Sequence, residues 1–252
     1  MRYLFSFLIL SLALSGPASA QSAEEHIALG DRDYTALEGA SALANYEKAI
    51  AIDPRSYEAL WKASRSAVDI GSLGTNSSRR SSLFNSAEQY ARRAIALNPG
   101  DAEGHFSLAR ALGKTALSQS PRGRVKYATE IRARALECLR LAPQHAGCLH
   151  VMGMWNAEVM RLNAVTRLIA KNVLGGRVFG TASWKDAVRY MEAAVASEPE
   201  RIVHRVDLAE IYDDVDEKGK ARAEYEAALR LPVADVNDNS YKAQARAGLA
   251  KL

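Results

Sequence analysis

Residues 208–232, LAEIYDDVDEKGKARAEYEAALRLP, contain the pattern from which the fold of the chain can be predicted. Apolar and small residues recur at helical spacing on both sides of the polar segment DDVDEKGK (213–220), which is predicted to be a solvated turn. Pro232 ends the stretch, and proline cannot continue a helix. The stretch is therefore predicted to form two antiparallel helices joined by a short connection.

The same ending, a small residue shortly before a proline, occurs five times along the chain. The five segments are AIAIDP, AIALNP, CLRLAP, AVASEP and ALRLP, which end at Pro54, Pro99, Pro143, Pro199 and Pro232. Each segment closes an apolar run with a helical period, which indicates a repeated unit of two helices. Small residues allow the two helices to approach closely, and aromatic residues fill the gaps between neighbouring pairs. The chain is therefore predicted to be all-α.

The first and last units place these residues where tetratricopeptide repeats carry them. The matching positions are Leu29, Gly30, Ala42, Tyr46 and Ala49 in the first unit, and Leu208, Ala209, Tyr212, Ala221, Tyr225 and Ala228 in the last. We therefore predict a tetratricopeptide-like, right-handed solenoid of about five helical hairpins. The polar, Ala-rich segment 240–252 is predicted to be a helix that caps the C-terminal end.

The central units are predicted to be enlarged, each in a different way. In the second unit the surplus GSLGTNSSRRSS (71–82) is rich in Gly, Ser and Asn and predicts a loop. In the third, a Ser-Pro break in SQSPRG (118–123) precedes a basic second helix. In the fourth, MWNAEVMRLNAVTRLIAKNVLGG (154–176) predicts an additional amphipathic helix over roughly 158–174. A short loop, RVFGTAS (177–183), then leads to a helix that starts at Trp184.

Residues 1–20, MRYLFSFLILSLALSGPASA, have the three-part pattern of a secretory signal peptide. Arg2 is followed by an apolar run, which is too short to span a bilayer, and then by the small residues Ala18, Ser19 and Ala20. We expect cleavage after residue 20, export to the periplasm or the medium, and a repeat domain over 21–252. An uncleaved membrane anchor is the alternative. No later run predicts a transmembrane segment.

The charge of the chain is concentrated in its middle. Residues 110–177 hold twelve Lys and Arg, three Glu and no Asp, whereas the whole chain has a net charge of only +4. A basic middle between acidic ends favours an acidic partner, such as an anionic lipid or amphiphile, an acidic protein or nucleic acid. The expected export argues against nucleic acid.

The additional helix of the fourth unit has two main interpretations. It could cover the inner surface of the superhelix, or it could line a groove together with the basic helix of the third unit. A helix lying on a membrane surface is a weaker third possibility. The groove would have an apolar floor and a cationic rim. Its candidate residues are Arg122, Arg124, Lys126, Arg132, Arg134, His150, Trp155, Leu162, Val165, Arg167, Ile169 and Lys171.

Catalytic and metal chemistry is not predicted. The spacing of His145, Cys148 and His150 does not place three metal ligands on one face of a helix, so packing roles are expected for Cys148 and His150. The sequence contains no phosphate-binding glycine motif and no nucleophile elbow. No cofactor, no metal and no enzymatic activity are therefore expected. Cys138 and Cys148 could form a disulfide after export or remain two buried thiols.

The runs LHVMGMWN (149–156), RLIAKNVLGG (167–176) and WKDAVRYMEAA (184–194) resemble the regulator of microtubule dynamics family. The resemblance covers about residues 57–232. The matching positions are His150, Met152, Gly153, Trp155, Arg167, Ile169, Ala170 and Lys171. It implies an all-helical repeat domain used for association. Animal members are linked to microtubules and to organelle contacts, where the repeat domain binds phospholipid.

The predicted function is non-catalytic binding of an acidic or amphiphilic ligand, a phospholipid or a peptide among them, in the concave groove. A protein–protein scaffold in cell-envelope assembly is the alternative from a different class. A microtubule-associated role follows from the family resemblance alone. Because the animal members face the cytosol, binding in the groove carries over to an exported chain more readily than a microtubule role does.

Overall fold

The fold is known from a computed structural model, which describes residues 21–163 and 176–252, without the side chains at 121, 122, 176 and 177. Within these ranges the chain forms eleven α-helices, one 3₁₀ helix and no strand. The predicted signal peptide lies outside the described residues. No helix in the described ranges combines the length and the apolar character needed to cross a bilayer.

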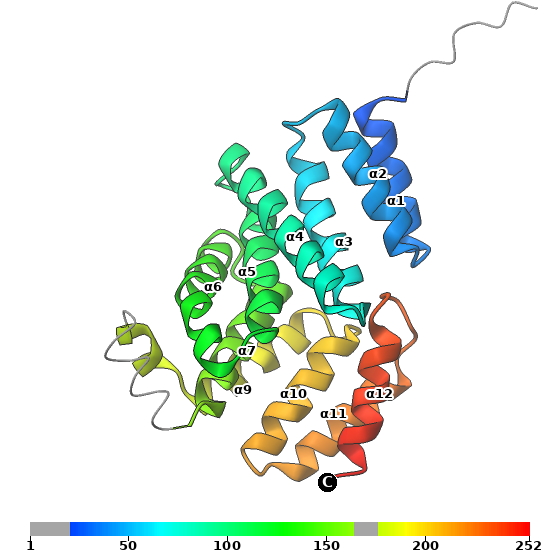
Figure 1. Cartoon of the computed structure of the whole chain (residues 1–252). Coiled ribbons are helices and arrows are strands. Elements are labelled where there is room, and N and C mark those ends of the chain that lie inside the picture. The colour runs from blue at the N-terminus through cyan, green and yellow to red at the C-terminus, as the bar shows by residue number, and fades with distance from the viewer. Residues whose placement is uncertain (1–20, 164–175) are drawn as a thin grey trace, which may run out of the picture.

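Five helical hairpins and a final helix follow one another along the chain (Figure 1). The hairpins are α1 (Ala23–Thr35) with α2 (Gly39–Ile52), α3 (Tyr57–Leu73) with α4 (Ser77–Leu97), α5 (Ala102–Leu117) with α6 (Pro121–Leu141), α7 (Ala146–Arg161) with α9 (Trp184–Ser197), and α10 (Ile202–Asp214) with α11 (Lys218–Arg230). The final helix, α12 (Asp238–Leu249), packs on α10 and α11. This arrangement confirms the predicted tetratricopeptide-like solenoid and its capping helix.

The prolines end the helices as predicted. The second helix of each hairpin stops two residues before its proline, at Ile52, Leu97, Leu141, Ser197 and Arg230. The ring of a proline disfavours helical backbone at the residue before it, and the intervening residues accordingly have extended ψ values between 77° and 147°. Each hairpin therefore closes at a point that the sequence specifies locally.

Small residues bring the helices of the outer hairpins together. The Tyr46 ring of α2 is fully buried against Gly30 of α1, where an added Cβ would lie 2.5 Å from Tyr46 Cε1. Tyr225 of α11 packs in the same way against Gly248 of α12. The close approach of helices therefore depends on glycine at these two positions, of which the repeat pattern predicted Gly30.

The predicted loop over 71–82 is wrong. Helix α3 continues to Leu73 and α4 begins at Ser77, so that only residues 74–76 connect them. Asn76 caps α4 because its side chain accepts a hydrogen bond of 2.9 Å from the backbone N–H of Arg79. The Ser- and Arg-rich segment is thus the first turn of a 21-residue helix, and the second unit is enlarged by longer helices.

The third and fourth units agree with the sequence in part. Pro121 occupies the first turn of α6 and Ser120 caps it, which confirms the predicted break. Residues 158–161 of the predicted additional helix belong to α7, and residues 164–174 lie outside the described residues. The predicted loop after it is largely a 3₁₀ helix, Gly176–Thr181, and α9 begins at Trp184 as expected.

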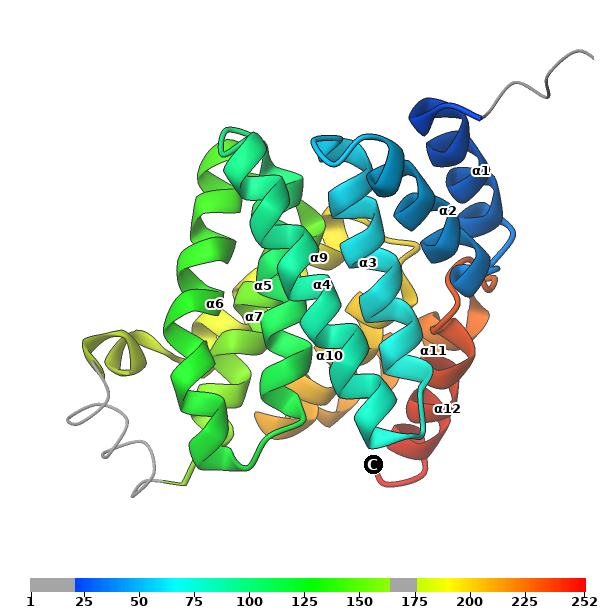
Figure 2. The same cartoon turned by 45° about the horizontal axis from the view of Figure 1, so that its top comes forward.

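The solenoid curls until its last turn meets its first (Figures 1 and 2). The connection before α12 contacts the first two hairpins: Val236 lies near Gly39, and Asn237 Nδ2 reaches Asp69 of α3. The first helix of each hairpin, part of α6, and α12 face the space within the curl.

Candidate functional site

A cavity of about 830 Å³ lies inside the closed solenoid. Its lining comes from the inner faces of successive helices, among them Trp61 on α3, Arg110 on α5, His150 on α7, His204 on α10 and Tyr241 on α12. The volume falls within the range of roughly 300–1,000 Å³ that is typical of small-molecule sites. The concave face of the solenoid is therefore hollow and large enough to hold a ligand.

The structure places the predicted groove residues in three groups. Arg124, His150, Trp155 and Leu162 are among the residues that line the cavity. Lys126, Arg132 and Arg134 lie on α6 but are not among the described lining residues. The side chain of Arg122, together with Val165, Arg167, Ile169 and Lys171, lies outside the described residues.

The basic residues of α6 have local partners. Arg124 Nη1 lies 2.6 Å from Glu158 Oε2 of α7. The Arg132 guanidinium lies over the Trp155 ring, 5.5 Å from its centroid. Arg134 Nε lies at 4.0 Å from Glu130 Oε1. These contacts join α6 to α7 or to itself, and the carboxylates of Glu158 and Glu130 offset part of the positive charge of α6.

A second set of cations, which sequence reasoning missed, lines the cavity from α3 and α5. Arg110 and Lys114 lie one helical turn apart on α5, and Arg65 of α3 stacks on the Tyr34 ring at 3.7 Å. Within the described residues, Lys114 Nζ has neither a hydrogen bond nor an ion pair. Burial, and then the positive charge of Arg110, lower the pKa of Lys114. More distant carboxylates favour its charged form, namely those of Asp207, Asp69 and Asp235. Lys114 is therefore a partly desolvated cation that faces the cavity without an ion-pair partner.

The seam between the first and last turns is a buried polar cluster centred on Asp69. The Asp69 carboxylate is fully buried and accepts hydrogen bonds from Arg110 Nη2 (2.5 Å), Tyr34 Oη (3.1 Å) and Asn237 Nδ2 (3.4 Å). Beside it, Arg201 Nη2 donates to Asp235 Oδ2 at 2.9 Å. Polar groups from α1, α3, α5 and α10 thus converge on the connection before α12 and close the ring.

Titratable pairs line the wall formed by α7 and α10. His150 Nε2 lies 2.7 Å from Asp207 Oδ2, and the rings of His150 and His204 are in contact, with centroids 4.8 Å apart. Burial lowers the pKa of His204 to about 4, despite the carboxylate of Glu198 at 3.5 Å. Burial, and then the charge of Asp207, raise the pKa of Glu210 to about 7. The charge of this wall therefore depends on pH.

One part of the cavity wall is apolar. It includes Leu117 of α5, Val125 of α6, Trp155 and Val159 of α7, and Phe179 of the 3₁₀ helix. The Trp155 indole N–H donates to the backbone carbonyl of Ala128 at 2.8 Å, so its one polar group is satisfied. The cavity thus has both cationic and apolar parts.

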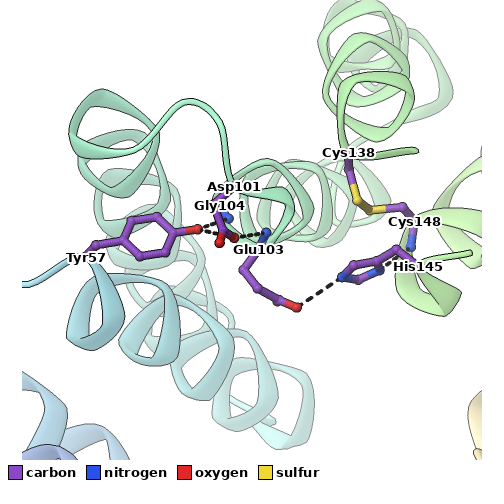
Figure 3. Close-up of a disulfide and its surroundings, with 7 residues drawn as sticks. All are labelled: Tyr57, Asp101, Glu103, Gly104, Cys138, His145 and Cys148. Carbon is purple, nitrogen blue, oxygen red and sulfur yellow. Dashed lines mark hydrogen bonds and ion pairs between the residues drawn. A yellow bond between two sulfur atoms is a disulfide. The ribbon is translucent and has the colours of Figure 1, made fainter. Parts of the chain in front are cut away.

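A disulfide lies at the corner where α6 meets α7 (Figure 3). Cys138 and Cys148 are bonded and fully buried, which resolves the two alternatives that the sequence left open. His145, which lines the cavity, caps α7 by accepting the backbone N–H of Cys148 at its Nδ1 atom (3.2 Å). Its Nε2 atom lies 3.2 Å from Glu103 Oε1 of α5. The corner therefore joins three helices.

The sequence contains only a weak indication of the cavity cations of α5. Arg110 and Lys114 follow an apolar helical pattern at a spacing of four, which by itself is typical of a solvated face. They face the cavity because α5 is the inner helix of its hairpin, and assigning inner and outer helices correctly would have identified them. The partner of Arg110 is 41 residues away in sequence, so the pairing itself gave no local signal.

Comparison with known proteins gives a family and a fold. The sequence profile described as "Regulator of microtubule dynamics protein 1-3" matches residues 27–252. Regulator of microtubule dynamics protein 1 of Bos taurus is 26% identical over 140 residues. That match covers 55% of this chain and 44% of the bovine protein, so the chain spans less than half the length of this relative.

Solved structures show the same helical fold at low sequence identity. A thermophilic tetratricopeptide-repeat protein of Thermus thermophilus has a TM-score of 0.66 and 20% identity, covering 91% of this chain and all of that one. PilF of Pseudomonas aeruginosa has a TM-score of 0.54 and 15% identity, covering 91% and 87%. These similarities support the tetratricopeptide-repeat architecture.

Proposed function

The chain belongs to the regulator of microtubule dynamics family, and from this premise we propose that it is a non-catalytic binding protein. Its ligand joins an acidic group to an apolar body and lies in the central cavity. The observation that carries the proposal is Lys114, a partly desolvated cation that faces an 830 Å³ cavity without a hydrogen bond or ion pair to its Nζ atom among the described residues. A buried charge without a partner is costly, and a ligand anion would supply one.

The distribution of side chains supports the two-part ligand. Arg110, one helical turn from Lys114, and Arg65, elsewhere in the same cavity lining, would add hydrogen-bond donors for a carboxylate or phosphate oxygen. Trp155 and Phe179 provide aromatic surface for the apolar body. Arg110 already binds Asp69, so Lys114 is the principal anchor of the acidic group.

Two sources could supply this chemistry. The tetratricopeptide-repeat fold suggests protein partners, and a peptide with an acidic and an aromatic or aliphatic residue has the required groups. An anionic lipid has them too, and the family resemblance favours it. A protein–protein scaffold without a bound ligand would instead use the outer surface and leave the cavity empty.

We also propose that residues 1–20 are removed during export and that 21–252 act in the periplasm or the medium. The Cys138–Cys148 disulfide is consistent with an oxidising compartment. N-terminal sequencing of the chain isolated from its host tests this directly. A first residue other than Gln21, or recovery only from the cytosol, would contradict the proposal.

Native mass spectrometry of the protein purified from its own host tests the ligand. We expect an added mass that fragmentation identifies as an anionic lipid or an acidic peptide. Flotation with vesicles of anionic phospholipid, compared with neutral phospholipid, separates the two sources. Protein that is repeatedly bare and floats equally with both vesicle types would overturn the proposal.

Two lysine variants locate the site. Lys114→Gln removes the cavity cation, whereas Lys126→Gln removes an exposed lysine of α6 that is not among the described lining residues. We expect Lys114→Gln to lower the retained ligand at least tenfold, because about 1.4 kcal/mol of binding free energy corresponds to a factor of ten. Lys126→Gln should retain it. The reverse result would place the ligand on α6 outside the cavity.

A further inference from the structure

The corner between α6 and α7 brings together three side chains that can bind a metal ion (Figure 3). Cys138, His145 and Cys148 each offer one ligand atom, and these atoms lie within 4.8 Å of one another. In the part of the chain that the structure describes, no other group of three His, Cys, Asp or Glu residues meets this criterion. The sequence led us to consider His145, Cys148 and His150 instead and to predict no metal site; Cys138, which completes the present group, comes from the preceding helix.

The hydrogen bonds of His145 fix its tautomer. Its Nδ1 atom accepts the backbone N–H of Cys148, so Nδ1 carries a lone pair and the ring proton is on Nε2. Nε2–H then donates to the Glu103 carboxylate at 3.2 Å. A carboxylate that holds one imidazole nitrogen while the other binds the ion recurs around metal-bound histidines. Here the Nδ1 lone pair would have to exchange its hydrogen bond from Cys148 for a bond to the metal ion.

We propose that the reduced form of this corner binds a zinc ion through Cys138, Cys148 and His145. Two thiolates and one imidazole nitrogen, with water in the fourth position, form a tetrahedral zinc site of a known type. The site and the disulfide exclude each other, because the same two sulfur atoms take part in both. The corner therefore has a disulfide state and a metal state.

The conversion between the two states is a balanced two-electron step. A dithiol reductant supplies two electrons and two protons and becomes a disulfide itself, or a phosphine does so with one water molecule and becomes the phosphine oxide; the Cys138–Cys148 S–S bond breaks and two thiols form. Zinc binding then releases both protons as two Zn–S bonds and one Zn–N bond form. His145 lines the central cavity whereas both cysteines are fully buried, so an ion would have to enter from the His145 side. The inference does not depend on the proposed ligand of that cavity.

Titration of the full-length mature chain with Co²⁺, as a spectroscopic substitute for Zn²⁺, tests the proposal. We expect the phosphine-reduced, chelator-treated protein to bind one Co²⁺ per chain, with thiolate-to-cobalt charge-transfer absorption. Zn²⁺ should displace the Co²⁺ and abolish this absorption. The oxidised protein should bind no Co²⁺ with such absorption. Reduced protein without the charge-transfer band would overturn the proposal.

Three variants make the assignment specific. His145→Asn retains an oxygen that can cap α7 but loses the imidazole, and we expect it to weaken zinc binding at least about tenfold. Glu103→Gln removes the charge behind His145 and should weaken binding about 10–100-fold. His150→Gln, in the same cavity wall, is the matched control and should have no effect. Equal zinc affinity in all three variants would assign the ion to another site.

Discussion

Two groups of buried charges face the central cavity, and they differ in whether each charge has a partner. At the seam, Asp69 binds Arg110 and Asp235 binds Arg201, so the acids and bases that join the first and last turns are paired. In the cavity wall, Lys114 and Glu210 have no hydrogen-bond or ion-pair partner among the described residues. The first group holds the ring closed, and the second leaves charge available to a ligand.

The pKa values follow this difference. Burial alone would raise the pKa of Asp235, but Arg201 and the backbone N–H of Asn237 lower it below its usual range. The seam therefore favours the charged form. In the wall, burial lowers the pKa of Lys114 and raises that of Glu210, so the fold disfavours both charges. Disfavoured charges in a cavity are a common feature of binding sites.

The largest effect is expected at the centre of the seam. Asp69→Ala leaves Arg110 buried without its counter-ion and removes the acceptor of Tyr34 and Asn237. We expect the free energy of unfolding to fall by about 3–5 kcal/mol, measured by urea denaturation. Asp213→Ala, at an exposed aspartate of α10, should change it by less than about 0.5 kcal/mol. Equal effects would mean that the seam does not stabilise the ring.

The hairpins could be predicted from the sequence because their signals are local. The second helix of each hairpin ends two residues before a proline, and the Gly30–Tyr46 contact lies within one repeat. The local error at 71–82, predicted as a loop, arose because Ser and Asn favour both loops and helix N-termini. Asn76 is the N-cap of α4. Composition alone does not distinguish the two.

The seam and the cavity could not be predicted in this way. Asn237 and Asp69 are 168 positions apart, and they meet because a small rotation between hairpins accumulates over five units. That rotation depends on many side-chain contacts rather than on a motif. The sequence therefore predicted a concave basic surface and assigned its charge to α6 and to residues 167 and 171. Arg124 of α6 lines the cavity, but so do Arg110 and Lys114 of α5, which were not among the predicted groove residues.

The unpaired acid of the wall should make stability depend on pH. Because folding raises the pKa of Glu210 from 4.5 to about 7, its protonated form is favoured in the folded state. Its contribution to stability is complete below pH 4.5 and is lost as pH rises through 7. Glu210→Gln should therefore gain about 2 kcal/mol over the parent chain between pH 4.5 and 8. Denaturation curves across this range measure the difference between the two chains. A constant difference would contradict the burial of this acid.

The unpaired base should show a smaller effect. Lys114→Met keeps the length of the side chain and removes a charge that the fold disfavours. We expect about 1 kcal/mol of added stability at pH 7, with the loss of ligand described above. The gain should disappear as pH rises past the ordinary lysine pKa of about 10.4, where the parent lysine is neutral in both states. Thermal unfolding at pH 7 and pH 11 distinguishes this from a simple packing effect.

The smallest effect on stability is expected for an exposed ion pair, which makes two hydrogen bonds where the buried Arg110–Asp69 pair makes one. Arg92 of α4 binds Glu130 of α6 through two hydrogen bonds of 2.8 and 2.9 Å, yet the two side chains are 45% and 35% exposed. Arg92→Ala should cost only about 0.5 kcal/mol, and less at 1 M salt, because water and ions screen the charges. Asp69 and Arg92 both join residues of different hairpins, so burial is the variable that separates them. A loss above about 3 kcal/mol at Arg92 would show that long-range pairing, rather than burial, determines the strength of the seam.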